Sequence, residues 1–98
     1  MATERQVQET IARCVALMVF HHNCERSQEA RDRMIAEVQI IAGFVEELGF
    51  SRSGVDWRIM RPIEAELIAR YGHEVGPRLF AMFADAFEDS FEAADRPA

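Results

Sequence analysis

The residues best suited to chemistry are two histidines and a glutamate, His21, His22 and Glu25, which follow the first apolar segment of the chain. Imidazole and carboxylate groups are good ligands for zinc or iron, and a twofold dimer would supply two copies of the set. If one helix continues past residue 22, these residues lie on its apolar face with Cys14 and Met18. The simpler interpretation is that the histidines interact favourably with the dipole at the helix C-terminus. We therefore expect no metal or other cofactor, and keep a site at His21, His22 and Glu25 as the alternative.

Signals for catalysis are weaker elsewhere in the chain. Glu37 lies in the apolar sector of the second helical segment, where a buried carboxylate would need a partner such as Arg33. Cys24 lies in an expected turn, but a nucleophilic cysteine also needs an orienting group and an oxyanion site, which the sequence does not offer. His73 would begin a zinc-protease motif, but the second histidine that this motif needs is replaced by Pro77. We therefore predict that the protein is not an enzyme.

A third group combines arginines with the single tryptophan. Arg52, Arg58 and Arg61 surround Trp57, with Asp56 as the one acid among them. Arginine and tryptophan are enriched in binding hot spots, and such a group could also hold a phosphate or a carboxylate. A solvated turn in which Trp57 covers the end of the core is the plainer interpretation. We predict that Trp57, Arg58 and Arg61 are partner-binding residues.

These groups must be positioned by helices, because apolar residues recur at helical spacing and no stretch alternates as a strand would. A capping box at Thr3 and Gln6 begins the first helix, Ser27 caps the second, and Gly49 ends it. Pro77 suits the first position of the last helix. The periodicity predicts helices over about 4–22, 27–48, 54–71 and 77–93, followed by a frayed tail over 95–98.

The fold class expected from this pattern is all-α, a small four-helix arrangement of two antiparallel helical hairpins. Short connections favour antiparallel neighbours, and a chain of 98 residues has the size of one domain, over 1–98. The periodicity does not decide whether residues 4–48 form a hairpin or one bent rod. In the first two segments the predicted core faces include Val7, Ile11, Cys14, Val15 and Met18, and then Met34, Val38, Ile41 and Val45.

The last helical segment has an apolar face and an acidic face. The apolar face carries Leu79, Phe80, Phe83, Phe87 and Phe91. A core helix is the simplest interpretation of this pattern, and an acidic amphipathic helix that lies in a partner's groove is the alternative. The acidic polar face does not suit a helix that lies on a membrane surface.

Composition excludes several further classes. The chain has 17 acidic and 11 basic residues, a net charge of −6, whereas nucleic-acid-binding proteins usually have a basic footprint. Its longest apolar run, residues 14–20, is far shorter than the ~20 residues of a membrane span. Cys14 and Cys24 would lie about 15 Å apart on one helix, too far for a disulfide. We therefore predict a cytoplasmic protein that binds neither nucleic acid nor membrane.

The chain also has more apolar surface than one small core should cover. Phe20 lies on the polar side of the first helix, and Ile35 and Ile40 lie on opposite flanks of the second. Single exposed apolar residues are normal, but burial against a second copy explains all three, and twofold dimers are the commonest oligomers. Another protein is the second candidate partner. We predict a protein–protein interaction module (an adaptor, regulator or accessory subunit) that acts as a homodimer, with Phe20, Ile35 and Ile40 as partner-binding residues.

Overall fold

The structure confirms that the fold is all-helical. This computed structural model describes residues 3–24 and 27–95, and the side chains of this part up to residue 90. Within these residues there is no strand, and none of the helices is long and apolar enough to cross a membrane. The elements follow in the order α1 (Glu4–Asn23), α2 (Gln28–Glu47), α3 (Arg52–Val55), the π-helical turn η1 (Asp56–Met60) and α4 (Arg61–Asp95).

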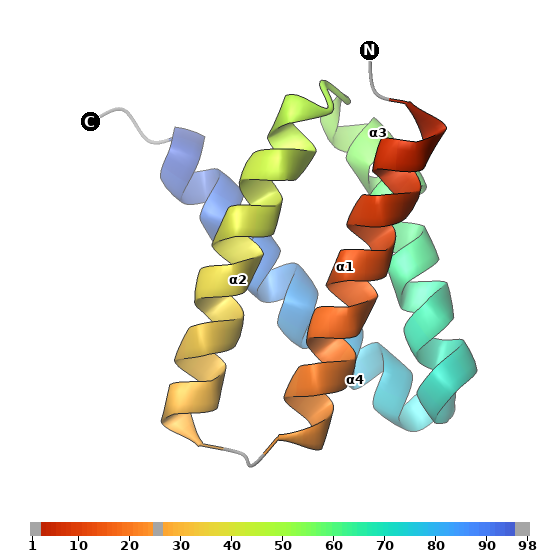
Figure 1. Ribbon diagram of the computed structural model, residues 1–98, viewed down its shortest axis with the longest axis vertical. Coiled ribbons are helices and arrows are strands. Elements are labelled where there is room, and N and C mark those ends of the chain that lie inside the picture. Colours follow the sequence, from red (N-terminus) through yellow and green to blue (C-terminus); the bar gives the residue numbers. More distant parts are fainter. Residues whose placement is uncertain (1–2, 25–26, 96–98) are drawn as a thin grey trace.

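Local sequence signals determine where the first two helices begin. The hydroxyl of Thr3 accepts a hydrogen bond from the backbone N–H of Gln6 at 3.2 Å, and the Gln6 side chain accepts one from the backbone N–H of Thr3 at 2.9 Å. The Ser27 hydroxyl accepts a hydrogen bond from the N–H of Ala30 at 3.1 Å and so caps α2. The two helices are separate and run side by side in opposite directions (Figure 1). Residues 4–48 therefore do not form one bent rod.

The π-helical turn η1 lies between α3 and α4. Its Asp56 carbonyl accepts a hydrogen bond from the backbone N–H of Arg61, five residues further along rather than four. The next residue explains this widening, because Pro62 has no N–H to donate and its ring would clash with the Arg58 carbonyl in a regular α-helix. The helix predicted over 54–71 thus begins at Arg52 and continues through a wider turn.

The prediction that the last helix begins at Pro77 is wrong. The backbone of α4 leaves the helical conformation at Gly72, where φ is 85° and ψ is 178°, and Pro77 lies inside the helix that follows. Glycine adopts such a positive φ at little cost, whereas Pro77 near the start of a helix removes only one backbone hydrogen bond. The helix continues to Asp95 rather than ending at residue 93. Of the predicted frayed tail, residues 96–98 lie outside the described residues.

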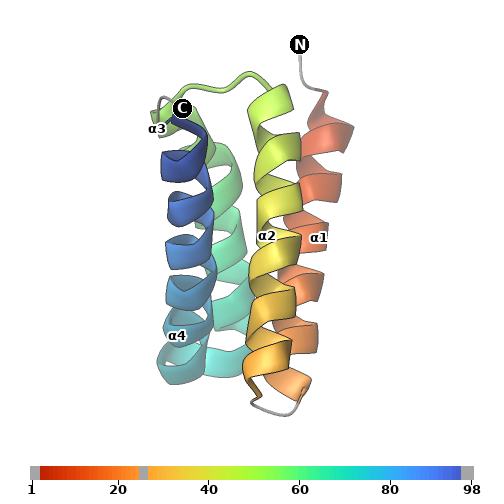
Figure 2. The same cartoon turned by 90° about the vertical axis from the view of Figure 1, so that its left-hand side faces the viewer.

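The two halves of α4, on either side of Gly72, form a second layer behind α1 and α2. Figure 2 shows the two layers edge-on, with α1 and α2 in one and the halves of α4 in the other. The two halves approach each other closely near the bend: a Cβ on Gly76 would lie only 2.7 Å from the Cα of Ile68. One side of the α1–α2 layer thus packs against α4, and the other side faces outward, toward the viewer of Figure 1.

The core lies between the two layers, and no polar or charged residue is buried in the part of the chain that the structure describes. The predicted core residues of both helices are buried, namely Val7, Ile11, Cys14, Val15 and Met18 of α1 and Met34, Val38, Ile41 and Val45 of α2. In α4, Phe83 is fully buried and its ring stacks on Phe87 at a centroid distance of 5.7 Å. These two rings are core residues and not anchors for a partner's groove. The side chain of Phe91 lies outside the described residues.

Candidate interaction surface

The outward side of α1 and α2 carries three large apolar side chains that the core does not cover. Phe20 is 58% exposed, Ile40 52% and Phe44 43%. Phe20 and Ile40 are therefore exposed, as the sequence predicts. Phe44 was not predicted, although it lies four residues after Ile40 and so belongs to the same side of α2.

These side chains belong to two exposed stripes, which together we call the α1–α2 face. In α1 the stripe consists of Arg5, Glu9, Arg13, Ala16 and Phe20. In α2 it consists of Glu29, Arg33, Glu37, Ile40, Phe44 and Glu47. Successive members are three or four residues apart, which is the spacing of residues at the contact between packed helices. The face is therefore arranged as a helix-packing surface, although no described residue covers it.

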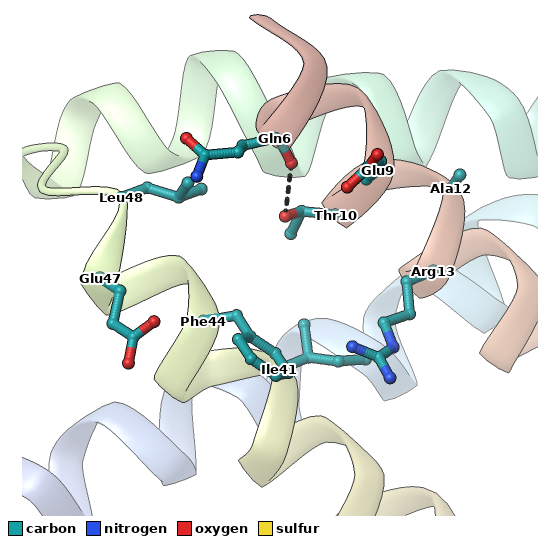
Figure 3. Close-up of a pocket in the computed structure, with 9 residues that line it drawn as sticks. All are labelled: Gln6, Glu9, Thr10, Ala12, Arg13, Ile41, Phe44, Glu47 and Leu48. Carbon is teal, nitrogen blue, oxygen red and sulfur yellow. Dashed lines mark hydrogen bonds between the residues drawn. The ribbon is translucent and has the colours of Figure 1, made fainter. Parts of the chain in front are cut away.

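A groove follows the seam between the two helices along this face. One half of the groove, near the start of α1, is lined by polar residues of α1 and by Ile41, Phe44 and Leu48 of α2 (Figure 3). The other half, near the turn, is mostly apolar, with Leu17 and Phe20 among its lining residues. An apolar centre with charged residues at its rim, as in this second half, is the usual make-up of a protein interface.

Charge on the α1–α2 face is nearly balanced, unlike the charge of the whole chain. Its three arginines and four glutamates give −1, against −6 for all 98 residues. Glu37, which the sequence places in an apolar sector, is exposed on this face and not buried. The guanidinium of Arg13 lies 5.2 Å from the centre of the Phe44 ring, and Arg5 pairs with Glu9 at 3.1 Å.

Ile35, which the sequence predicts to bind a partner, is covered in part by the chain itself. It is half-buried and packs against the core. The reason is that α2 contacts both α1 and α4, so that a wider arc of α2 is covered than one neighbour would cover. Ile35 therefore contributes to the fold, and the α1–α2 face does not include it.

Trp57 and its neighbouring arginines form a separate exposed cluster on η1 and the start of α4. Trp57 is 67% exposed, so it does not cover the end of the core. The guanidinium of Arg61 lies 4.9 Å from the Trp57 ring and 3.6 Å from the carboxylate of Asp56. Arg58 pairs with Glu4 at 3.2 Å and so connects η1 to the start of α1. Both arginines thus have acidic partners within the chain, which weakens their attraction for an external anion.

The histidine pair occupies the turn end of the fold. The His22 ring packs edge-on against the Tyr71 ring at 4.7 Å and so joins the end of α1 to α4. His21 lines the apolar half of the groove. No three histidine, cysteine or carboxylate side chains gather as metal ligands in the described ranges, and Glu25 lies outside them. The metal alternative therefore gains no support from the geometry of the described residues.

The two cysteines are unbridged and differ in environment. Cys14 is buried, and Cys24 is half-exposed at the turn end of the groove. Burial raises the pKa of the Cys14 thiol from its ordinary value of 9.0 to about 12, although the nearby charge of Arg13 opposes this shift in part.

We expect only Cys24 to react with a thiol reagent when the native protein is in dilute solution near pH 8. The reactive form is the thiolate, which at this pH is almost absent at Cys14 because burial raises its pKa. A colorimetric thiol titration should count one thiol per native chain and two in denaturant. Cys24→Ser should leave the native chain unreactive, and rapid reaction of that variant would contradict the buried position of Cys14.

In comparisons with known proteins, no family model matches the chain, no curated protein matches its sequence, and no solved structure matches its fold. The geometry of the chain itself is therefore the basis for a functional proposal.

Proposed function

We propose that the protein is a non-enzymatic interaction module, an adaptor, regulator or accessory subunit, that forms a homodimer through its α1–α2 face. The observation that carries the proposal is the exposure of Phe20, Ile40 and Phe44 on the two stripes of this face, with Phe20 lining the apolar half of the groove and Phe44 the other half. Three large apolar side chains exposed on one face of a small chain mark a candidate interaction surface. The cytoplasmic location expected from the sequence stays a prediction, as does the expectation that neither nucleic acid nor membrane is a partner.

The nearly balanced charge of this face suits a second copy of the chain as the partner. A chain with a net charge of −6 repels its own kind over most of its surface. The α1–α2 face, at −1, is a region where two copies can approach with little repulsion. A basic partner, by contrast, would be attracted to the more acidic parts of the chain, which lie elsewhere.

The size of the face also suits a dimer. Helices of 20 residues, such as α1 and α2, are about 30 Å long, and packed helices lie about 9 Å apart. The face therefore measures about 30 by 20 Å, so that two copies would bury about 1,200 Å² in total. Stable protein interfaces begin at about this size.

Ile40→Glu should convert the dimer to a monomer. The substitution replaces a large apolar side chain near the middle of the interface by a carboxylate that must lose its water there, which should raise the dimer Kd about a hundredfold, or by about 3 kcal/mol. Sedimentation velocity at micromolar concentrations should show a dimer for the unaltered chain and a monomer for this variant, with unchanged helical circular dichroism.

Trp57→Glu is the matched control for this experiment. It places the same charge on an exposed apolar residue of the other cluster, beside Arg61, and should leave the dimer intact. A monomeric unaltered chain would contradict the proposal. A dimer that Trp57→Glu disrupts and Ile40→Glu does not would show that the Trp57 cluster is the interface instead.

A further inference from the structure

We infer that the two copies pack in parallel, with their turn ends together and α1 of each copy over α2 of its partner. The inference rests on the proposed function, because it assumes a dimer formed through the α1–α2 face. It is carried by the arginines of the α1 stripe and the glutamates of α2 that lie level with them along the two helices.

Positions on α1 and α2 can be compared because the two helices meet at one end of the molecule and run in opposite directions (Figure 1). A helix rises about 1.5 Å per residue. Distances along each helix axis are counted from its end at the turn, which is Asn23 in α1 and Gln28 in α2. On this measure Arg5 lies about 27 Å from the turn and Glu47 about 28 Å. Arg13 and Glu37 lie about 15 and 14 Å from it. Each arginine of α1 is thus level with a glutamate of α2.

A twofold axis parallel to the helices keeps these levels and exchanges the two helices. Arg5 then faces the partner's Glu47, and Arg13 faces the partner's Glu37. Because the axis is twofold, each of these pairs occurs twice. Every arginine of the α1 stripe thus meets a glutamate across the interface.

The apolar end of the face fits the same arrangement. Phe20 lies about 5 Å from the turn, midway between the levels of Glu29 at about 2 Å and Arg33 at about 8 Å, so that its ring is within reach of the partner's Arg33. A guanidinium on the face of an aromatic ring is a favourable contact. Arg13 already makes one with Phe44 inside the chain, at 5.2 Å.

A twofold axis that crosses the helices instead brings like charges together. With the two faces fully overlapped, each helix lies over its own copy in reverse, so that Arg13 meets the partner's Arg13 and Glu37 meets the partner's Glu37. Glu47, about 28 Å from the turn, meets the partner's Glu29, about 2 Å from it. Like charges opposed in an interface are strongly unfavourable. The parallel arrangement is therefore the one that the charges favour.

The ion pair between Arg5 and Glu9 within the chain does not prevent this exchange. The two side chains are 87% and 66% exposed, and such surface pairs contribute little. Arg5 is therefore free to turn from Glu9 toward the partner's Glu47.

Disulfide trapping between chains that each carry one introduced, exposed cysteine tests the arrangement. All variants carry Cys24→Ser, and Cys14 is buried and does not compete. An equal mixture of Arg5→Cys and Glu47→Cys chains should form a mixed disulfide dimer under mild oxidation. A mixture of Glu47→Cys and Glu29→Cys chains is the matched control, and its mixed disulfide should be at least about tenfold less abundant, as expected for an arrangement disfavoured by about 1.4 kcal/mol.

The reverse result, with the second mixture cross-linking and the first not, would overturn the parallel arrangement and leave the proposed dimer intact. Sedimentation of the unaltered chain distinguishes failure of the parallel arrangement from failure of the proposed dimer. If that chain is a monomer and neither mixture cross-links, the proposed function itself fails. If it is a dimer and neither mixture cross-links, the dimer uses another surface, and both proposals fail.

Discussion

Phe83→Ala should lower the free energy of unfolding by about 3–5 kcal/mol, more than any other single change that we consider. Phe83 is fully buried where α4 packs against α1 and α2, and its ring stacks on Phe87 at 5.7 Å. Removal of the ring leaves a cavity that the surrounding helices cannot fill without moving apart. A chain of this size has about 5–15 kcal/mol of stability in total, so the loss is a large fraction of it.

Urea denaturation followed by circular dichroism measures this loss. The protein should be dilute enough to be monomeric, because a dimer would stabilise the folded state by mass action. Phe20→Ala is the matched control: it removes the same ring from a position that is 58% exposed, and should change the monomer by less than about 1 kcal/mol. Equal losses for the two variants would contradict the assignment of Phe83 to the core and of Phe20 to the outward face.

Gly76→Ala should destabilise the fold by about 2–3 kcal/mol, although alanine normally favours helices over glycine. The added Cβ would lie 2.7 Å from the Cα and 2.8 Å from the backbone nitrogen of Ile68. Both contacts are with backbone atoms, which cannot rotate away as the end of a flexible side chain can. The two halves of α4 must therefore separate at the bend near Gly72, which disturbs the layer that covers the core.

Gly43→Ala is the control for this prediction. Gly43 lies inside α2, is exposed, and has no neighbouring atom within 4 Å of an added Cβ. Alanine should therefore stabilise the helix there by about 0.5–1 kcal/mol. The two variants should thus shift the urea midpoint of the monomer in opposite directions. A stabilising Gly76→Ala would show that the halves of α4 do not pack as closely as described.

Whether a predicted interaction residue is exposed depends on which other helices pack against its own helix. Sequence periodicity places Phe20, Ile35 and Ile40 away from the centre of an apolar stripe and predicts that all three bind a partner. Phe20 and Ile40 are exposed, whereas Ile35 packs against the core because α2 contacts α4 as well as α1. Phe44 was missed since a single aromatic residue on the flank of a stripe is as typical of a core residue as of a surface one.

The sequence by itself determined the helical class, the beginnings of the first two helices and the buried stripes of α1 and α2. These features are local: a capping box such as Thr3 and Gln6, or apolar residues three and four apart, act within one or two turns of the chain. Local signals do not determine where the last helix begins, because Gly72 and Pro77 can both interrupt a helix.

Only the tertiary structure determines that the helix is interrupted at Gly72 and not at Pro77. It also determines how much of the apolar surface of α1 and α2 stays exposed. The chain bends at Gly72 because Gly76 lets the two halves of α4 approach closely, a contact between residues of different turns that periodicity does not record. The covered arc of each helix likewise depends on how many neighbours it has. Periodicity orients a side chain about its own helix axis, whereas burial is determined by the other helices that pack around that axis.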